Sequence, residues 1–109
     1  MTATVIPAGT VVRCPKMETG KVVGHGRAVV LGLFNETDPT SGYLVWFYGK
    51  GAKKCGSLVF RREMTIVGTI EEMSVRTLTT VARGLNGVAG GHALWMRAGS
   101  LLLRKRATV

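Results

Sequence analysis

Acidic side chains are scarce in this chain: its 109 residues include six aspartates and glutamates and fifteen lysines and arginines. The resulting formal net charge of +9 predicts an acidic partner, such as nucleic acid, an anionic membrane or an acidic protein, with nucleic acid favoured. No two of the acids have a spacing that suggests acid–base catalysis, and no serine has the context of a catalytic nucleophile. We therefore expect a binding protein and not an enzyme.

Cysteine, histidine and long apolar runs are also in short supply. Cys14 and Cys55 form no CxxC pair, which excludes a zinc site of the usual spacing, and both are expected to be reduced thiols. His25 and His92 have no second ligand at a recognisable spacing, so no metal or cofactor is predicted. No apolar stretch approaches the roughly 18 residues of a membrane span. The N-terminus lacks the pattern of a signal peptide, and we expect a soluble, cytoplasmic protein that binds no membrane.

The composition of the chain changes near Gly68. The first part is rich in valine, threonine, tyrosine and phenylalanine with glycines at short intervals, which is typical of strands and turns. The second part has no proline and carries apolar residues at helical spacing. We expect a single domain over residues 1–109, with a β-barrel in residues 8–70 and a helical extension in residues 70–106.

Five short strands are expected in the first part. Their ranges are Gly9–Cys14, Gly20–Phe34, Tyr43–Tyr48, Ser57–Phe60 and Met64–Ile70. Pro15 is expected to end the first strand, because proline cannot donate a hydrogen bond to a strand ladder. Gly24 and Gly26 predict a bulge or a sharp bend in the second range, which is then either one bent strand or two strands.

This succession of strands and turns resembles the SH3-like small β-barrel, the architecture of KOW, Tudor and Sm-like modules. The resemblance covers about residues 8–70 and implies a barrel of about five strands. Together with the one or two C-terminal helices expected after it, this gives an α+β fold. Type II dihydrofolate reductases are also short SH3-like barrels. Val59 and Arg61 stand here where that family has a glutamine and a tyrosine that would orient substrate and cofactor, so this activity is not expected. Barrels of this kind bind RNA, DNA, peptides or other proteins, so the fold alone does not select a function.

One or two helices are expected in the second part. Thr69 and Glu72 have the spacing of a capping box, which predicts that the first helix begins there. Its apolar stripe consists of Leu78, Val81, Ala82 and Leu85. Gly84 and Gly87 are candidate stop signals. The second helix is expected from about His92 to Arg104.

The stretch Tyr48–Gly56, with the sequence YGKGAKKCG, combines lysines and glycines in the manner of a phosphate-binding loop. Gly51 follows Lys50 where a P-loop requires serine or threonine, so a nucleotide-binding loop is excluded. The stretch is expected to be a hairpin tip whose lysines either neutralise backbone phosphates or keep a sheet edge soluble. The residues that we expect to contact nucleic acid are Lys50, Lys53, Lys54, Arg61, Arg62, Arg104, Lys105 and Arg106.

The strand that precedes this stretch is apolar on both faces. Alternation places Tyr43, Val45 and Phe47 on one side and Leu44, Trp46 and Tyr48 on the other. Either Trp46 and Tyr48 are exposed and stack on bases, or a C-terminal helix or a second subunit covers them. The second interpretation is favoured, because amphipathic helices need an apolar surface to pack against.

Nucleic-acid binding, to DNA or RNA and mainly through backbone phosphates, is the function that the sequence favours. The alternative is a protein-interaction module, such as a phage- or plasmid-encoded regulator that binds an acidic host protein. In that case Trp46, Tyr48 or Trp95 would supply the interface. A homo-oligomer is compatible with either function.

Overall fold

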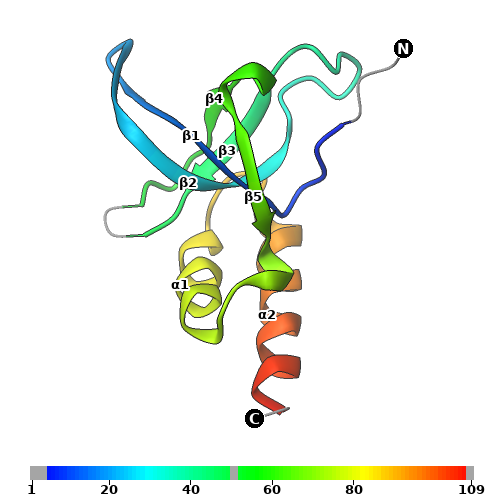
Figure 1. The fold of residues 1–109 in the computed structure, drawn as a ribbon. Coiled ribbons are helices and arrows are strands. Elements are labelled where there is room, and N and C mark those ends of the chain that lie inside the picture. Colours follow the sequence, from blue (N-terminus) through cyan, green and yellow to red (C-terminus); the bar gives the residue numbers. More distant parts are fainter. Residues whose placement is uncertain (1–4, 50–51, 108–109) are drawn as a thin grey trace.

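The computed structural model describes residues 5–49 and 52–107, which form an antiparallel sheet followed by two helices (Figure 1). The strands are β1 (Thr10–Glu18), β2 (Lys21–Leu33), β3 (Tyr43–Phe47), β4 (Ser57–Val59) and β5 (Thr65–Thr69). Two short 3-10 turns, η1 (Arg61–Glu63) and η2 (Ile70–Glu72), flank β5. The helices are α1 (Val75–Leu85) and α2 (His92–Ala107). The α+β class and the five strands are therefore confirmed, and of the one or two C-terminal helices expected from the sequence the structure has two.

The sheet is open in the part of the chain that the structure describes. Its strand order is β4-β3-β2-β1-β5, so β4 and β5 form its two edges and do not pair with each other. Because these two edge strands do not pair, the expected closed barrel is not confirmed. One physical reason is that β4 contributes only three residues, which gives a short edge for any closing ladder.

The strand β1 does not end at Pro15 as expected. It continues to Glu18, and Pro15 lies opposite His25 of β2. The pairing between β1 and β5 stops at Arg13, so Pro15 lies where one side of β1 is an unpaired edge. A missing N–H is tolerated on such an edge, and the proline therefore does not break the strand.

The irregularity expected near Gly24 is present, but it does not divide the strand. Lys16 pairs with Gly24 and Met17 pairs with Val22, so Val23 is an extra residue on β2. This is a β-bulge within one continuous strand. The hairpin is closed by two residues, Thr19 and Gly20, both with positive φ, as in a type I′ turn.

The sheet has an apolar core on each face. One face carries a cluster of Ile6, Val12, Cys14, Ala28, Val30, Tyr43, Val45, Val59 and Met64. The other face packs against both helices through Val11, Val29 and Trp46. The helices contribute Leu78, Val81, Leu85, Leu94, Ala98, Leu101 and Leu102 to this second cluster. The predicted alternation along β3 and the predicted apolar stripe of the first helix are both confirmed.

The helix α1 begins later than the capping-box spacing predicts. Its N-cap is Ser74, whose Oγ accepts a hydrogen bond from the Thr77 N–H at 3.2 Å. Thr69 and Glu72 instead flank η2, where the Thr69 hydroxyl donates to the Glu72 carboxylate at 3.2 Å. Met73 then adopts an extended conformation, which separates this 3-10 turn from the helix. Thr69 and Glu72 bond to each other across a single 3-10 turn. The prediction that the first helix begins at these residues was therefore wrong.

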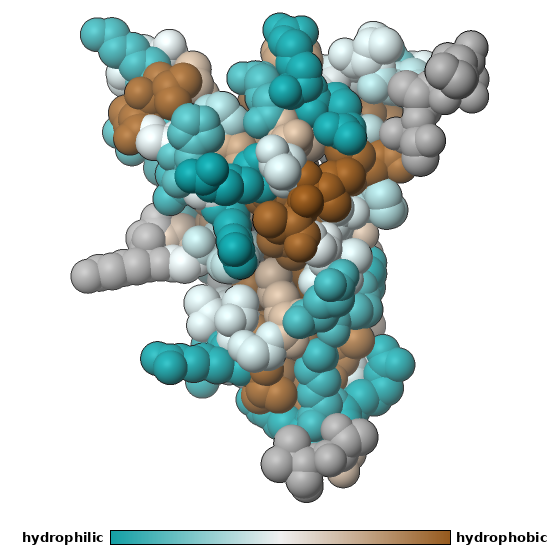
Figure 2. All heavy atoms as spheres, viewed as in Figure 1, coloured by the Kyte–Doolittle hydropathy of each residue, from teal (hydrophilic) through white to brown (hydrophobic). Residues whose placement is uncertain are grey.

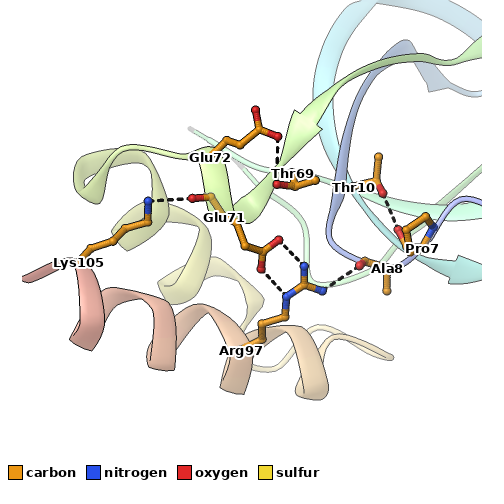
Figure 3. Close-up of polar contacts among 8 residues, drawn as sticks. All are labelled: Pro7, Ala8, Thr10, Thr69, Glu71, Glu72, Arg97 and Lys105. Carbon is orange, nitrogen blue, oxygen red and sulfur yellow. Dashed lines mark hydrogen bonds and ion pairs between the residues drawn. The ribbon is translucent and has the colours of Figure 1, made fainter.

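Polar contacts fasten α2 to η2 and to the N-terminal segment (Figure 3). The Arg97 guanidinium pairs with the Glu71 carboxylate and also donates to the Ala8 carbonyl at 3.0 Å. Lys105 Nζ donates to the Glu71 carbonyl at 2.8 Å. The hydrogen bond from Arg97 lowers the pKa of Glu71 from its ordinary value. Two cations of α2 thus hold the helix in place.

Candidate functional site

The lysines of the Tyr48–Gly56 stretch lie beside the end of α1. Lys54 Nζ donates to the Asn86 carbonyl at 2.9 Å, at the C-cap of the helix. A cation at this end of a helix is stabilised by the helix dipole and satisfies an otherwise unpaired carbonyl. Lys53 is exposed, and its carbonyl accepts a hydrogen bond within the fold. Lys50 lies outside the residues that the structure describes.

The remaining expected contact residues are distributed over the two ends of the molecule. Arg61 and Arg62 belong to η1, at the top of Figure 1, where Arg62 lies 5.2 Å from the centre of the Phe60 ring. Arg104, Lys105 and Arg106 belong to the last turns of α2, at the bottom of the same view. The predicted set therefore does not form one continuous surface. Sequence proximity grouped side chains that the strands and helices carry apart.

The indole of Trp46 is buried between β3 and α1, with 1% of its surface exposed. Its Nε1 donates to the Lys53 carbonyl at 2.7 Å, and its six-membered ring lies against Gly84 of α1. The interpretation in which a helix covers this strand is confirmed, and an exposed stacking platform that includes Trp46 is wrong. Tyr48 is half-buried beside it, while Trp95 is exposed on α2.

A two-stranded ribbon extends from the sheet beyond the ends of the neighbouring strands. The β1–β5 pairing ends at Arg13, and the β2–β3 pairing begins at Ala28. Among the strands that the structure describes, Cys14–Glu18 and Lys21–Arg27 therefore pair with each other and with no third strand. Figure 1 shows this ribbon, in blue and cyan, projecting from the sheet away from the helices. We call it the β1–β2 ribbon.

Two arginines lie directly opposite each other at the base of the β1–β2 ribbon. Arg13 and Arg27 are cross-strand partners, both exposed, on the face that also carries Val11 and Val29. The Cβ atoms of such partners are about 4.5–5.5 Å apart, and like-charged side chains at directly opposite positions destabilise a sheet. Within residues 5–49 and 52–107 neither arginine forms an ion pair, and the carboxylate that lines the same hollow as Arg27 is that of Glu72.

The opposite face of the ribbon carries a further cation. Lys16 Nζ lies 5.5 Å from the centre of the Phe47 ring, and the lysine chain crosses over Gly26. A Cβ at Gly26 would be 2.5 Å from Lys16 Cε, so glycine makes room for this side chain. Beside it is a hollow of about 140 Å³ whose lining includes Tyr48, Lys53 and Cys55. Cations therefore occur on both faces of the β1–β2 ribbon.

The two cysteines have different environments. Cys14 is buried in the core, and burial, followed by the charge of Glu63, raises its pKa to about 11. Its thiol is therefore protonated and inert at neutral pH. Cys55 is a free thiol at the surface. In the described part of the chain, no group of three or more histidines, cysteines and acids is placed to hold a metal ion.

Sequence reasoning missed the ribbon cations Arg13, Lys16, Lys21 and Arg27. A signal was present, because residues 13–27 contain these four basic residues and one acid, Glu18. Their separation along the chain concealed it, since only the hairpin register brings Arg13 next to Arg27.

The fold and the ribbon define a small basic α+β protein with an exposed cationic hairpin. The chain belongs to a family of unknown function, DUF6409, whose model matches residues 1–107. No curated protein and no solved structure is significantly similar to it. Neither helix, over the residues described, has the length and apolar character needed to cross a bilayer.

Proposed function

We propose that this protein binds nucleic acid through backbone phosphates and that the β1–β2 ribbon is its main contact surface. The Arg13–Arg27 pair carries the proposal. Two like charges held directly opposite each other lower the stability of the free protein. A phosphate between them relieves the repulsion and accepts hydrogen bonds from both guanidinium groups. The net charge of +9 supports the same class of partner.

The other cations of the ribbon add positive charge on its opposite face and toward its tip. Lys16 lies on the opposite face of β1, and Lys21 begins β2 after the turn. Lysines contact phosphates as point charges and carry no information about base sequence. The binding that we propose is therefore sensitive to salt and independent of base sequence along the ribbon.

We further propose that the sheet is a variant of the SH3-like architecture and that the protein binds its partner without catalysis. The strand order β4-β3-β2-β1-β5, the bulged β2 and the 3-10 turn before β5 support the first part. Small barrels of this class present exposed strands and hairpins to their ligands. The charge of the ribbon gives this chain a binding surface, and no described cluster of side chains suggests a reaction.

Fluorescence anisotropy with labelled DNA and RNA at low salt tests the proposal. Arg13→Gln combined with Arg27→Gln is expected to weaken binding at least several-fold, because two phosphate-binding cations are removed. The matched control is Arg62→Gln combined with Arg104→Gln, which removes the same charge from exposed positions on η1 and α2. The control should weaken binding much less. Equal effects in the two variants, or no binding by the wild-type protein, would contradict the proposal.

A second candidate function is docking of an acidic protein onto α2. Trp95, Met96 and Leu103 are exposed on this helix although they are large and apolar. Arg104 lies beside Leu103, and an apolar surface next to a cation is complementary to an acidic amphipathic helix.

Site-specific photocrosslinking from position 103, with mass spectrometry of the product, tests this second candidate. An acidic protein attached at that position, and absent after Trp95→Ser, is the expected result. A crosslink to nucleic acid, or no crosslink, would contradict it.

A further inference from the structure

We propose that the β1–β2 ribbon enters a groove of duplex DNA and places the apolar side chains of its tip against the bases. This inference rests on the proposed function and specifies its ligand. The tip consists of Met17, Val22 and Val23, together with the two-residue turn at Thr19 and Gly20.

The tip is unusually apolar for a projecting hairpin. Met17, Val22 and Val23 are 48%, 55% and 57% exposed. Figure 2 shows apolar surface near the end of the ribbon, at the upper left, beside hydrophilic side chains. These side chains contribute little to either core, because neither cluster of buried residues includes them. Their exposure needs another reason, and contact with an apolar or stacked surface supplies one.

The β-bulge increases the apolar area at this place. Without an extra residue in β2, a single valine would stand opposite Met17, but the bulge brings Val23 to the same level of the ribbon as Val22. Bulges of this kind redirect side chains at the ends of sheets. The tight turn that follows, with Thr19 at φ 49°, keeps the tip short.

The residues along one face of the ribbon follow the order that a groove requires. Arg13 and Arg27 lie at the base, Pro15 and His25 come next, and Met17 pairs with Val22 at the tip. In a duplex, phosphates line the rims of a groove and base edges form its floor. An inserted ribbon therefore places its arginines at the phosphates and its apolar tip at the bases.

One carboxylate lies on the ribbon, and it does not oppose this arrangement. Glu18 is the cross-strand partner of Lys21, so a cation directly across the ribbon offsets its charge. Lys16 adds a further positive charge two residues away on the same strand.

The dimensions of the ribbon favour B-form DNA over duplex RNA. Its five β1 residues, Cys14–Glu18, span about 17 Å at about 3.4 Å per residue. The major groove of B-form DNA is about 12 Å wide and about 8.5 Å deep, and it admits a two-stranded ribbon. The major groove of A-form RNA is deep and narrow, and side chains do not reach its bases. Apolar side chains that insert between base pairs, as minor-groove binders show, unstack the base step.

The experiment compares the wild-type protein with two variants and one conservative control variant on defined probes. One probe is duplex DNA that contains 2-aminopurine, whose fluorescence rises when its base step is unstacked. The others are duplex RNA of the same sequence and vesicles of phosphatidylcholine with phosphatidylserine. The tip variant is Val22→Ser with Val23→Ser, and the base variant is Arg13→Gln with Arg27→Gln. Both pairs are exposed, so circular dichroism should show an unchanged fold.

The expected results separate this inference from the proposed function. Wild-type protein should bind duplex DNA about tenfold more tightly than duplex RNA and raise the fluorescence of the probe. The tip variant should abolish the fluorescence rise and most of the preference for DNA but keep its salt dependence. The conservative variant, Val22→Ile with Val23→Ile, should retain both the fluorescence rise and the preference for DNA. The base variant should bind both nucleic acids weakly.

Four outcomes would overturn the inference. Equal affinity for the two duplexes, or a tip variant that behaves as wild type, would refute groove entry and leave phosphate binding intact. The absence of any nucleic-acid binding by wild-type protein would refute both. Binding to the vesicles that the tip variant abolishes, without any binding to DNA, would assign the tip to a membrane surface instead.

Discussion

The contact between Gly84 and Trp46 leads to a quantitative prediction about stability. A Cβ added at Gly84 would be 2.4 Å from Cη2 and 2.5 Å from Cζ2 of the indole. Carbon atoms in ordinary contact are about 3.5–4.0 Å apart, so an alanine requires the ring or the helix to move by about 1 Å. The ring cannot move easily, because it is buried and its Nε1 is bonded to the Lys53 carbonyl.

Two opposing contributions set the change in the free energy of unfolding that is expected for Gly84→Ala. Overpacking a tight core costs about 1–3 kcal/mol, and this rigid contact belongs at the upper end of that range. Alanine in place of glycine within a helix contributes about 1 kcal/mol of stability. We therefore expect a net destabilisation of about 2 kcal/mol, which for a domain of this size lowers Tm by about 8–16 °C.

Gly99→Ala is the matched control, because Gly99 also lies within a helix but a Cβ there would meet nothing within 4 Å. This substitution keeps the gain in helix propensity without the clash and should raise Tm by about 4–8 °C. Thermal denaturation followed by circular dichroism measures both. Adding Trp46→Phe to Gly84→Ala should recover part of the stability, because the smaller ring frees space. Equal increases in Tm for the two alanine variants would show that α1 does not pack on Trp46.

Three further predictions concern charge and thiol chemistry. Arg27→Thr should raise the free energy of unfolding by about 0.2–1 kcal/mol in urea denaturation, because it removes the repulsion from Arg13; a decrease in stability would contradict this account of the pair. Cys55 should react with a thiol reagent in the folded protein, whereas Cys14 should react only after unfolding, and two fast-reacting thiols would be the contrary result. The hydrogen bond from Arg97 lowers the pKa of Glu71 in the folded protein, so the pair stabilises the fold at neutral pH. This contribution to stability disappears as the pH falls through the folded pKa of Glu71. Denaturation at a series of pH values should show that Glu71→Gln flattens this acidic decline by about 0.2–1 kcal/mol, the small effect of an exposed pair.

Local patterns in the sequence predicted the strands and helices better than the residues at which they begin and end. Alternation along β3 assigned Val45 and Trp46 to opposite faces, because the period of two follows from strand geometry alone. The apolar stripe of α1 was predicted just as directly, because it follows from the helical period. The start of that helix was misplaced, since Thr69 and Glu72 satisfy each other around a single 3-10 turn as readily as at a helix end.

The candidate site was harder to predict, because it depends on register. Nothing local to Arg13 indicates that Arg27 is its partner; the two-residue turn at Thr19–Gly20 and the bulge at Val23 together determine the pairing. A turn of three residues would pair Arg13 with a different side chain. The same tertiary arrangement separates Arg62 from Arg104, although their basic character had grouped them in the sequence.

The most direct test of the central claim is the salt dependence of duplex DNA binding by the wild-type protein and by the Arg13→Gln, Arg27→Gln variant. If both arginines bind phosphates, the slope of log K against log salt concentration should become shallower by about 1.8, at about 0.9 for each phosphate that is no longer neutralised. The Arg62→Gln, Arg104→Gln variant should keep the wild-type slope. An unchanged slope in the first variant, or an equal change in both, would contradict the assignment of phosphate binding to the β1–β2 ribbon.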